Sequence, residues 1–215
     1  MKLYETIEYC KICFSKINDI SFFHLFSNKI LLCQNCQNSL KAKFIKFKIG
    51  NIDALSLYEY DETIKKLIYT YKGCYDIELK NVFLHRYLLY LQTLYRNYYV
   101  IPIPSNKIED QKRGFNHVKE ICSTLKLPML DVLEKHTREK QSSKTSKDRL
   151  KIEKYLTIKS KEILYGKKVL LVDDIYTTGA TMFKAIELVK TAKPKKIKVL
   201  VIAKTIDLDK RGSNY

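Results

Sequence analysis

Residues 169–181, with the sequence VLLVDDIYTTGAT, constrain the fold of this chain more than any other segment. Their apolar start predicts a buried strand that ends at Asp173 and Asp174, and the residues after Gly179 predict a helix. A strand, a short turn and a helix in direct succession are typical of a parallel sheet, because helical crossovers join parallel strands. The chain should therefore contain an α/β domain.

The turn in this segment has the residue types of a phosphate-binding loop. Backbone N–H groups at the start of a helix are unpaired and lie at the positive end of its dipole, threonine hydroxyls add donors, and glycine allows close approach or a positive φ. Two carboxylates beside the turn would repel a bare phosphate, so we expect them to accept hydrogen bonds from ribose hydroxyls. The segment therefore predicts a site for a phosphorylated ribose. The expected binding residues are Asp173, Asp174, Thr177, Thr178, Gly179, Ala180 and Thr181.

Other motifs fit these residues less well. VLLVDD is similar to a Walker B strand, but the chain contains neither the GxxxxGK[ST] loop that accompanies one nor a GxGxxG dinucleotide motif. Receiver domains also have an acidic strand end, but TTGAT does not follow it there. The whole segment resembles the phosphoribosyl pyrophosphate motif of type I phosphoribosyltransferases. That resemblance implies phosphoribosyl pyrophosphate as the ligand.

The remaining sequence also alternates between strand and helix patterns. We expect strands at 55–60, 98–104, 167–174 and 195–205, and helices at 61–73, 77–95, 116–125 and from about 180. This order predicts a mainly parallel sheet with flanking helices, similar to the type I phosphoribosyltransferase fold. Residues 134–163 are dominated by Lys, Arg, Glu, Ser and Thr and are too long for a simple connector, so we expect a flexible flap there.

Four cysteines near the N-terminus form two C-x2-C pairs separated by nineteen residues: Cys10, Cys13, Cys33 and Cys36. Two such pairs in a segment too short for its own core predict a zinc ribbon, in which four thiolates close a tetrahedral structural site. Either pair alone would also fit a redox motif. His24 is the one competing ligand, whereas Cys74 and Cys122 are expected to be buried or partly buried thiols. We expect a zinc-ribbon module at 1–50 and the α/β domain at 51–215.

The chain carries a formal charge of +17 and has a pI near 9.5. This excess suggests a polyanionic partner such as nucleic acid, although codon bias toward lysine can also produce it. Sixteen tyrosines offer rings on which the bases of a single strand could stack. The sequence has neither a signal-peptide run nor a transmembrane run, and we expect a cytoplasmic protein.

Several stretches resemble the ComF family, and most closely its ComFC type, in which a zinc ribbon precedes a phosphoribosyltransferase-like domain. Besides the cysteines and residues 169–181, they are YEYDETIKKLIYTYK (58–72), IPIPSNKIEDQKRGFNH (101–117) and the sparse set Arg138, Gln141, Asp148 and Arg149. All four residues of the sparse set fall within the expected flap at 134–163. The resemblance covers nearly the whole chain.

The resemblance implies a competence protein that takes up or processes single-stranded DNA during natural transformation, beside a DNA translocase. It implies structural zinc, and magnesium bound together with phosphoribosyl pyrophosphate. Lys112 and Arg113 are the cationic candidates for the pyrophosphate. The protein would be cytoplasmic and would reach the membrane-bound uptake machinery through its partners.

One position departs from the purine-salvage enzymes. Thr177 stands where hypoxanthine-type transferases usually carry an aspartate that acts as a base, and threonine has no useful pKa for that role. We therefore favour a ligand site within a DNA-handling protein. Two alternatives stay open: an active phosphoribosyltransferase with an unidentified acceptor base, and a ribbon that docks the translocase without contacting DNA.

Overall fold

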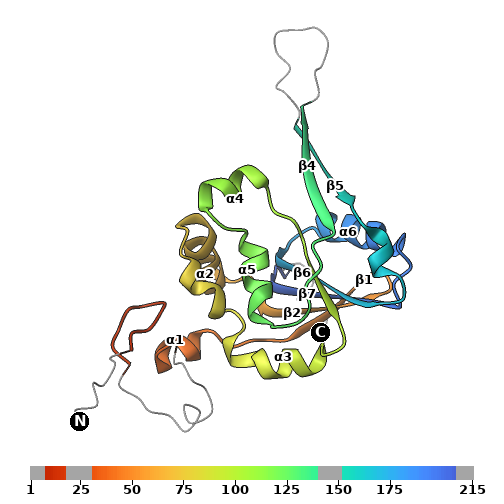
Figure 1. Cartoon of the computed structure of the whole chain (residues 1–215). Helices are drawn as coiled ribbons and strands as arrows, with labels where there is room; N and C mark the ends of the chain where they lie inside the picture. Colours follow the sequence, from red (N-terminus) through yellow and green to blue (C-terminus); the bar gives the residue numbers. More distant parts are fainter. Residues whose placement is uncertain (1–7, 18–30, 140–151, 207–215) are drawn as a thin grey trace, which may run out of the picture.

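The computed structural model describes residues 8–17, 31–139 and 152–206. Its centre is a five-stranded sheet in the order β1-β2-β7-β6-β3. The strands are β1 (Ile45–Ile49), β2 (Ile52–Glu59), β3 (Tyr99–Pro102), β6 (Lys168–Tyr176) and β7 (Lys196–Lys204). Only the edge strand β1 is antiparallel to its neighbour, so the expected mainly parallel sheet is confirmed (Figure 1).

Helices cover both faces of this sheet (Figure 1). The α-helices are α1 (Gln34–Ser39), α2 (Glu62–Gly73), α3 (Leu88–Leu94), α4 (Lys107–Arg113), α5 (His117–Thr124) and α6 (Ala180–Lys190), and the 3-10 turns are η2 (Ile77–Asn81), η3 (His85–Tyr87) and η4 (Lys161–Leu164). Asp61 caps α2, accepting a hydrogen bond from the Ile64 N–H at 3.0 Å, as the aspartate at the start of the expected helix suggests.

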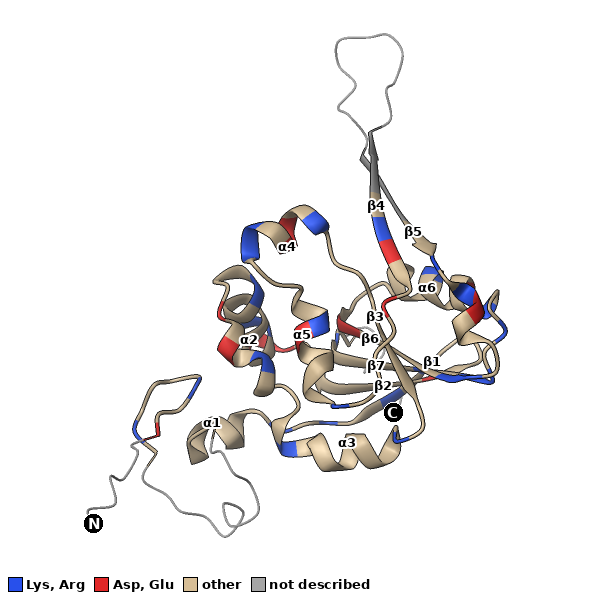
Figure 2. Cartoon of the chain, in the orientation of Figure 1, with Lys and Arg blue, Asp and Glu red and all other residues tan. Residues whose placement is uncertain are grey.

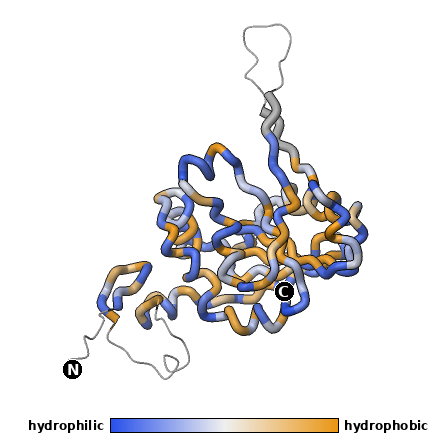
Figure 3. The backbone as a smooth tube through the Cα atoms, in the orientation of Figure 1, coloured by the Kyte–Doolittle hydropathy of each residue, from blue (hydrophilic) through white to orange (hydrophobic). Residues whose placement is uncertain are grey.

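Alternate residues of β6 supply two separate cores. Leu170 and Val172 pack in the cluster that includes α2, α3 and α5, whereas Val169 and Leu171 pack in the cluster that includes α6. Because successive side chains of a strand point to opposite faces, an apolar run such as this one is typical of a strand that is buried on both sides. Figure 3 shows the resulting hydrophobic centre of the molecule.

The expected flap begins and ends in a paired ribbon. β4 (Leu133–Glu139) and β5 (Ile152–Ile158) are antiparallel and project from the body of the molecule (Figure 1). Leu133 and Leu156 are buried in the cluster of α6 and anchor the base of this ribbon. Arg138 lies in β4, while Gln141, Asp148 and Arg149 lie outside the described residues, as does His24.

The prediction of one continuous helix at 77–95 is wrong. The chain forms η2, η3 and α3 there, with a break around three consecutive buried residues, Val82, Phe83 and Leu84. Consecutive helix residues point about 100° apart, so a straight helix on the sheet could not bury all three. Breaking the helix lets each of these side chains reach the core.

The sheet begins before the domain boundary expected at residue 50. β1 pairs with β2 through the two-residue turn Gly50–Asn51, so the cysteine module ends ahead of Ile45. Cys10, Leu31 and Leu40 are buried in the same cluster as α2 and α5. The module therefore packs against the domain as part of one core. No helix among the described residues is both long and apolar enough to cross a membrane.

Candidate functional site

The carboxyl ends of four parallel strands meet at one edge of the sheet. The loop after β6 reaches Gly179, the loop after β3 holds Ser105 and Asn106, and α2 follows β2 directly after Asp61. Ligands of open α/β sheets bind in the crevice outside these ends. The expected phosphate turn and the expected pyrophosphate loop therefore lie on the same edge.

The turn before α6 combines a left-handed glycine with the start of a helix. Gly179 precedes the helix with φ +77°, and the Phe183 N–H donates to its carbonyl at 2.8 Å. The first N–H groups of α6 have no partner within the helix. The side chains of Thr177, Thr178 and Thr181 are exposed and accept or donate no hydrogen bond within the described part of the chain. The turn can therefore present backbone and hydroxyl donors to an anion.

Tyr176 shapes this turn, a role that sequence reasoning missed. A Cβ atom on Gly179 would lie 2.3 Å from the Tyr176 hydroxyl, so any other residue would have to displace the Tyr176 side chain. The Tyr176 ring packs on Phe47 at a centroid distance of 4.9 Å, and the Lys204 ammonium lies 6.0 Å from its centroid. Side chains from β1 and β7 thus hold the ring that lies against the turn.

Asp173 and Asp174 are adjacent but have different surroundings. Burial, and next the neighbouring Asp174 charge, raise the pKa of the Asp173 carboxyl well above its ordinary value. Burial alone would also raise the pKa of Asp174, but the hydrogen bond from His117 and the charge of Lys72 outweigh it and hold that pKa below its usual range. The charge of Asp173 is therefore poorly compensated, whereas that of Asp174 is paired with cationic and hydrogen-bonding partners.

Asp174 is the centre of a partly buried charge network. Lys72 Nζ lies 2.6 Å from Asp174 Oδ2, and His117 Nε2 lies 3.1 Å from the same oxygen. Asp174 Oδ1 accepts from the Ile175 N–H at 2.7 Å. Both oxygens of this carboxylate are therefore engaged.

Arg113 fixes the orientation and tautomer of His117. Its Nη1 lies 3.1 Å from His117 Nδ1, and guanidinium can only donate, so Nδ1 accepts and the ring proton sits on Nε2, facing Asp174. Arg113 also pairs with Asp110 at 3.0 Å and donates from Nε to the Lys72 carbonyl at 2.9 Å. These contacts link α4, α5 and α2.

The two cationic candidates for the pyrophosphate differ in placement. The Arg113 side chain is only 5% exposed and is engaged by the Lys72 carbonyl, Asp110 and His117, whereas Lys112 is exposed on α4 and forms no ion pair with a described residue. Asn116, the N-cap of α5, fixes the loop after β3: its Nδ2 donates to Ser105 Oγ at 2.9 Å and to Asp110 Oδ2 at 2.8 Å. Lys112 is the freer of the two to meet a ligand.

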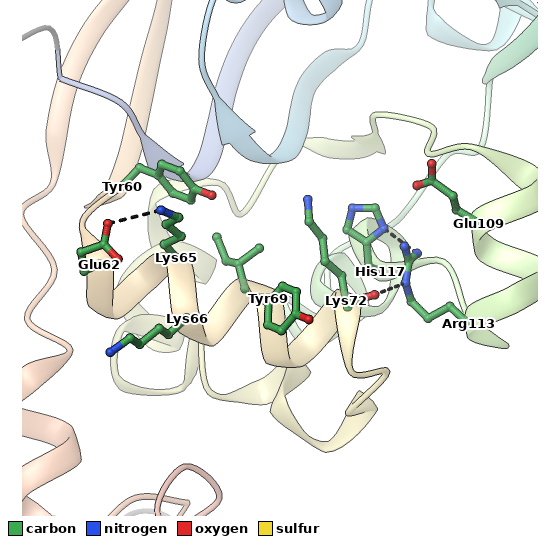
Figure 4. A pocket seen from close by; sticks show the side chains of 11 residues that line it. Tyr60, Glu62, Lys65, Lys66, Tyr69, Lys72, Glu109, Arg113 and His117 are labelled. Carbon is green, nitrogen blue, oxygen red and sulfur yellow. Dashed lines mark hydrogen bonds and ion pairs between the residues drawn. The ribbon is translucent and has the colours of Figure 1, made fainter.

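A hollow of about 480 Å³ lies between α2 and the α4–α5 region (Figure 4). Lys72 and His117 point into it from two sides, and Tyr60 and Tyr69 supply aromatic walls. The expected binding residues of 169–181 do not line it. This hollow is therefore a separate recess that shares Lys72 and His117 with the carboxylate network.

The cysteine module brings its four sulfur atoms together, with all four Sγ atoms within 4.8 Å of one another and Cys13 Sγ 3.6 Å from Cys33 Sγ. A tetrahedral zinc with Zn–S near 2.3 Å needs sulfur–sulfur edges of about 3.8 Å. Hydrogen bonds from Ser15 lower the pKa of the Cys13 thiol to about 6, which favours the thiolate. The donor set and spacing fit zinc, and four sulfurs leave it no open position, so the metal's role would be structural.

Comparisons with known proteins agree with this architecture. The family model described as a phosphoribosyl transferase domain matches residues 111–214. Competence protein ComFC of Streptococcus pneumoniae is 32% identical over 172 residues, which cover 80% of this chain and 74% of that protein. Competence protein ComFC of Bacillus subtilis is 31% identical over 129 residues, which cover 59% of this chain and 53% of that protein.

Solved structures with low sequence identity were also found. A hypoxanthine phosphoribosyltransferase from Staphylococcus aureus is 15% identical with a TM-score of 0.38, covering 65% of this chain and 69% of that chain. A hypothetical protein from Neisseria gonorrhoeae with bound ppGpp is 16% identical with a TM-score of 0.38, and the match covers 70% of this chain and 71% of that chain.

Proposed function

Because this chain belongs to the ComFC family of competence proteins, we propose that it binds phosphoribosyl pyrophosphate and assists the internalisation or processing of single-stranded DNA in natural transformation. The observation that carries the ligand proposal is the turn at Gly179, where helix N–H groups and three threonine hydroxyls have no partner among the described residues, and which follows the poorly compensated carboxylate of Asp173 on the same strand. A phosphate and a ribose satisfy both halves of this arrangement.

In this proposal each part of the carboxyl edge has its own task. Residues 177–181 bind the 5′-phosphate, and Asp173 accepts hydrogen bonds from the ribose hydroxyls. Asp174 holds Lys72 and His117 in place and reaches the ribose only if Lys72 moves from Oδ2. Lys112 meets the pyrophosphate, and Arg113 positions the network behind it. Magnesium, a hard and strongly hydrated ion, would be bound mainly by the ligand's own oxygens.

Isothermal titration with phosphoribosyl pyrophosphate and magnesium tests the ligand proposal. We expect saturable binding by the wild-type protein and at least tenfold weaker binding by Asp173→Asn. Lys195→Ala, an exposed change at the other end of the sheet, serves as the control. Equal affinity of Asp173→Asn and the wild type would contradict the role of this carboxylate.

A second candidate function is transfer of phosphoribose to an acceptor base, favoured by the match to the phosphoribosyl transferase domain. Thr177 offers no general base at the turn. His117 is committed through both ring nitrogens, to Arg113 and Asp174. Pyrophosphate release with a panel of bases, compared with the Asp173→Asn variant, separates the two functions. Binding without release with any base favours the ligand-site function.

The proposed DNA partner is tested by salt-dependent binding of an oligothymidylate. A protein that neutralises several phosphates loses affinity as salt rises. For single strands, the slope of log affinity against log salt concentration is roughly −0.7 per phosphate contact. Absence of binding at low salt would remove DNA as a direct partner. The DNA translocase would then be the remaining proposed partner, with the cysteine module as its docking site, which a pull-down with the translocase tests separately.

A further inference from the structure

Helix α2 forms a ridge between two hollows. Residues Thr63, Lys66 and Thr70 line a hollow of about 230 Å³ toward the cysteine module, while Lys65, Tyr69 and Lys72 line the larger hollow toward α4. Each set repeats at the three- and four-residue spacing of one helix flank. Lys66 lies on the crest and borders both hollows.

Each hollow contains an exposed aromatic ring. Phe14 in the cysteine module is 70% exposed and lines the smaller hollow, and Tyr69 is 66% exposed and lines the larger one (Figure 4). Tyr69 has room because Gly73 lies beneath it, and a Cβ on that glycine would lie 3.0 Å from the ring. Rings this accessible, set in recesses, are suited to stack on another flat group.

The charge on this ridge is positive. Lysines and arginines outnumber acidic residues on α2 and α4 (Figure 2). Lys65 pairs with Glu62 and Lys11 pairs with Glu78, whereas Lys66 forms no ion pair with any described residue. The crest therefore presents an uncompensated cation between the two aromatic rings.

We propose that the α2 ridge, from Phe14 across Lys66 to Tyr69, binds single-stranded nucleic acid, with bases stacked in the two hollows and the backbone phosphates on Lys66. Residues 63–72 span roughly 14 Å of helix axis, a length that a short segment of a single strand can cover. Alternation of stacking platforms with cations suits a strand of any sequence, because every base has a π-face. The proposal rests on the proposed DNA function and places it on a defined surface.

Two variants and two probes test this surface in the full-length, zinc-loaded protein. Lys66→Glu/Tyr69→Ala changes the ridge, and Lys161→Glu/Tyr165→Ala makes the same change in charge and ring content at η4, where Tyr165 is 73% exposed. The probes are fluorescein-labelled oligothymidylate and an abasic strand of equal length. We expect the ridge variant to bind oligothymidylate at least tenfold more weakly than wild type, and the η4 variant to bind as wild type does.

The single change Tyr69→Ala isolates stacking from charge. It should weaken oligothymidylate binding roughly tenfold and leave binding of the abasic strand unchanged. If wild type binds oligothymidylate and the ridge variant binds it equally well, the ridge proposal is overturned while the DNA function stands. If wild type binds the abasic strand as tightly as oligothymidylate, the ridge is a general polyanion surface and the proposal also fails. No binding by wild type overturns both.

Discussion

The ammonium nitrogen of Lys72 lies 2.6 Å from Oδ2 of Asp174, although the two residues are 102 positions apart in the chain. This ion pair joins the end of α2 to the end of β6. His117 approaches the same oxygen, and Arg113 orients His117 in turn. The carboxylate thus connects the proposed ribose site with the ridge helix, whereas its neighbour Asp173 is left largely uncompensated.

The two aspartates should respond in opposite ways to replacement by asparagine. Asp174→Asn removes the partner of Lys72, and we expect a loss of about 2 kcal/mol, below the range for fully buried pairs because Lys72 is 33% exposed. Asp173→Asn removes a partly buried, poorly compensated charge and should raise stability at neutral pH by ~1 kcal/mol. Urea unfolding measures both, and equal signs for the two variants would contradict the assignment.

The shifted pKa values of Asp173 and Asp174 make the stability of the protein depend on pH. The folded pKa of Asp174 lies below its unfolded value, so its stabilisation is complete above about pH 4 and is lost as the pH falls toward the folded pKa. The folded pKa of Asp173 lies above its unfolded value, so its contribution is favourable below about pH 4 and is lost as the pH rises through the folded pKa. The gain from Asp173→Asn should therefore disappear near pH 4 in thermal melts.

Arg113→Lys should damage the site although it keeps the charge. A lysine cannot donate at once to the Lys72 carbonyl, Asp110 and His117, which the guanidinium does. We expect a loss of about 2 kcal/mol in stability and free choice of tautomer for His117, visible in the ¹⁵N shifts of its ring. The adjacent Lys112→Ala should change stability by less than about 0.5 kcal/mol. A stable Arg113→Lys with an unchanged ring spectrum would show that the network tolerates the swap.

Local signals predicted the parts of the fold that depend on neighbouring residues. The strand, turn and helix of 169–190 and the Asp61 cap of α2 follow from sequence alone. Two local signals were missed: the alternation of FIKFKI before Gly50–Asn51, which marks the β1–β2 hairpin, and Asn106 with Glu109, which starts α4.

Sequence reasoning could not separate the two aspartates. They are adjacent and chemically identical, and they differ only because Lys72 and His117 reach one of them from distant elements. The same holds for Tyr176, whose fit against Gly179 depends on packing with Phe47 from β1. The pattern predicted which residue types meet at the carboxyl edge, but tertiary contacts determine how each is paired.

Gly179→Ala should disturb the proposed phosphate turn for two reasons. Alanine is strained at φ +77°, and its Cβ would displace the Tyr176 ring. We expect a stability loss of ~2–3 kcal/mol and at least tenfold weaker binding of phosphoribosyl pyrophosphate. Gly166→Ala is the matched control, because φ there is +68° but no atom lies within 4 Å of the added Cβ. It should cost ~1 kcal/mol and leave binding unchanged.

Loss of the metal should destabilise the core of the α/β domain as well as the cysteine module. Cys10 and the adjoining Leu31 and Leu40 belong to the same buried cluster as α2, so unfolding the module exposes part of that core. We expect Cys33→Ser to lose bound zinc and about 3 kcal/mol of stability, a fall of roughly 6–12 °C in Tm. Colorimetric zinc release and calorimetry measure the two effects.

Cys74→Ser is the control for this change, because Cys74 lies outside the four-sulfur cluster and is exposed; the expectation that it is buried or partly buried is wrong, whereas Cys122 is buried as expected. It should retain zinc and the wild-type Tm. Because the module supplies Phe14 to the proposed nucleic-acid ridge, Cys33→Ser should also displace Phe14 and weaken oligothymidylate binding. Zinc loss without any fall in Tm would show that the module and the domain core are energetically independent.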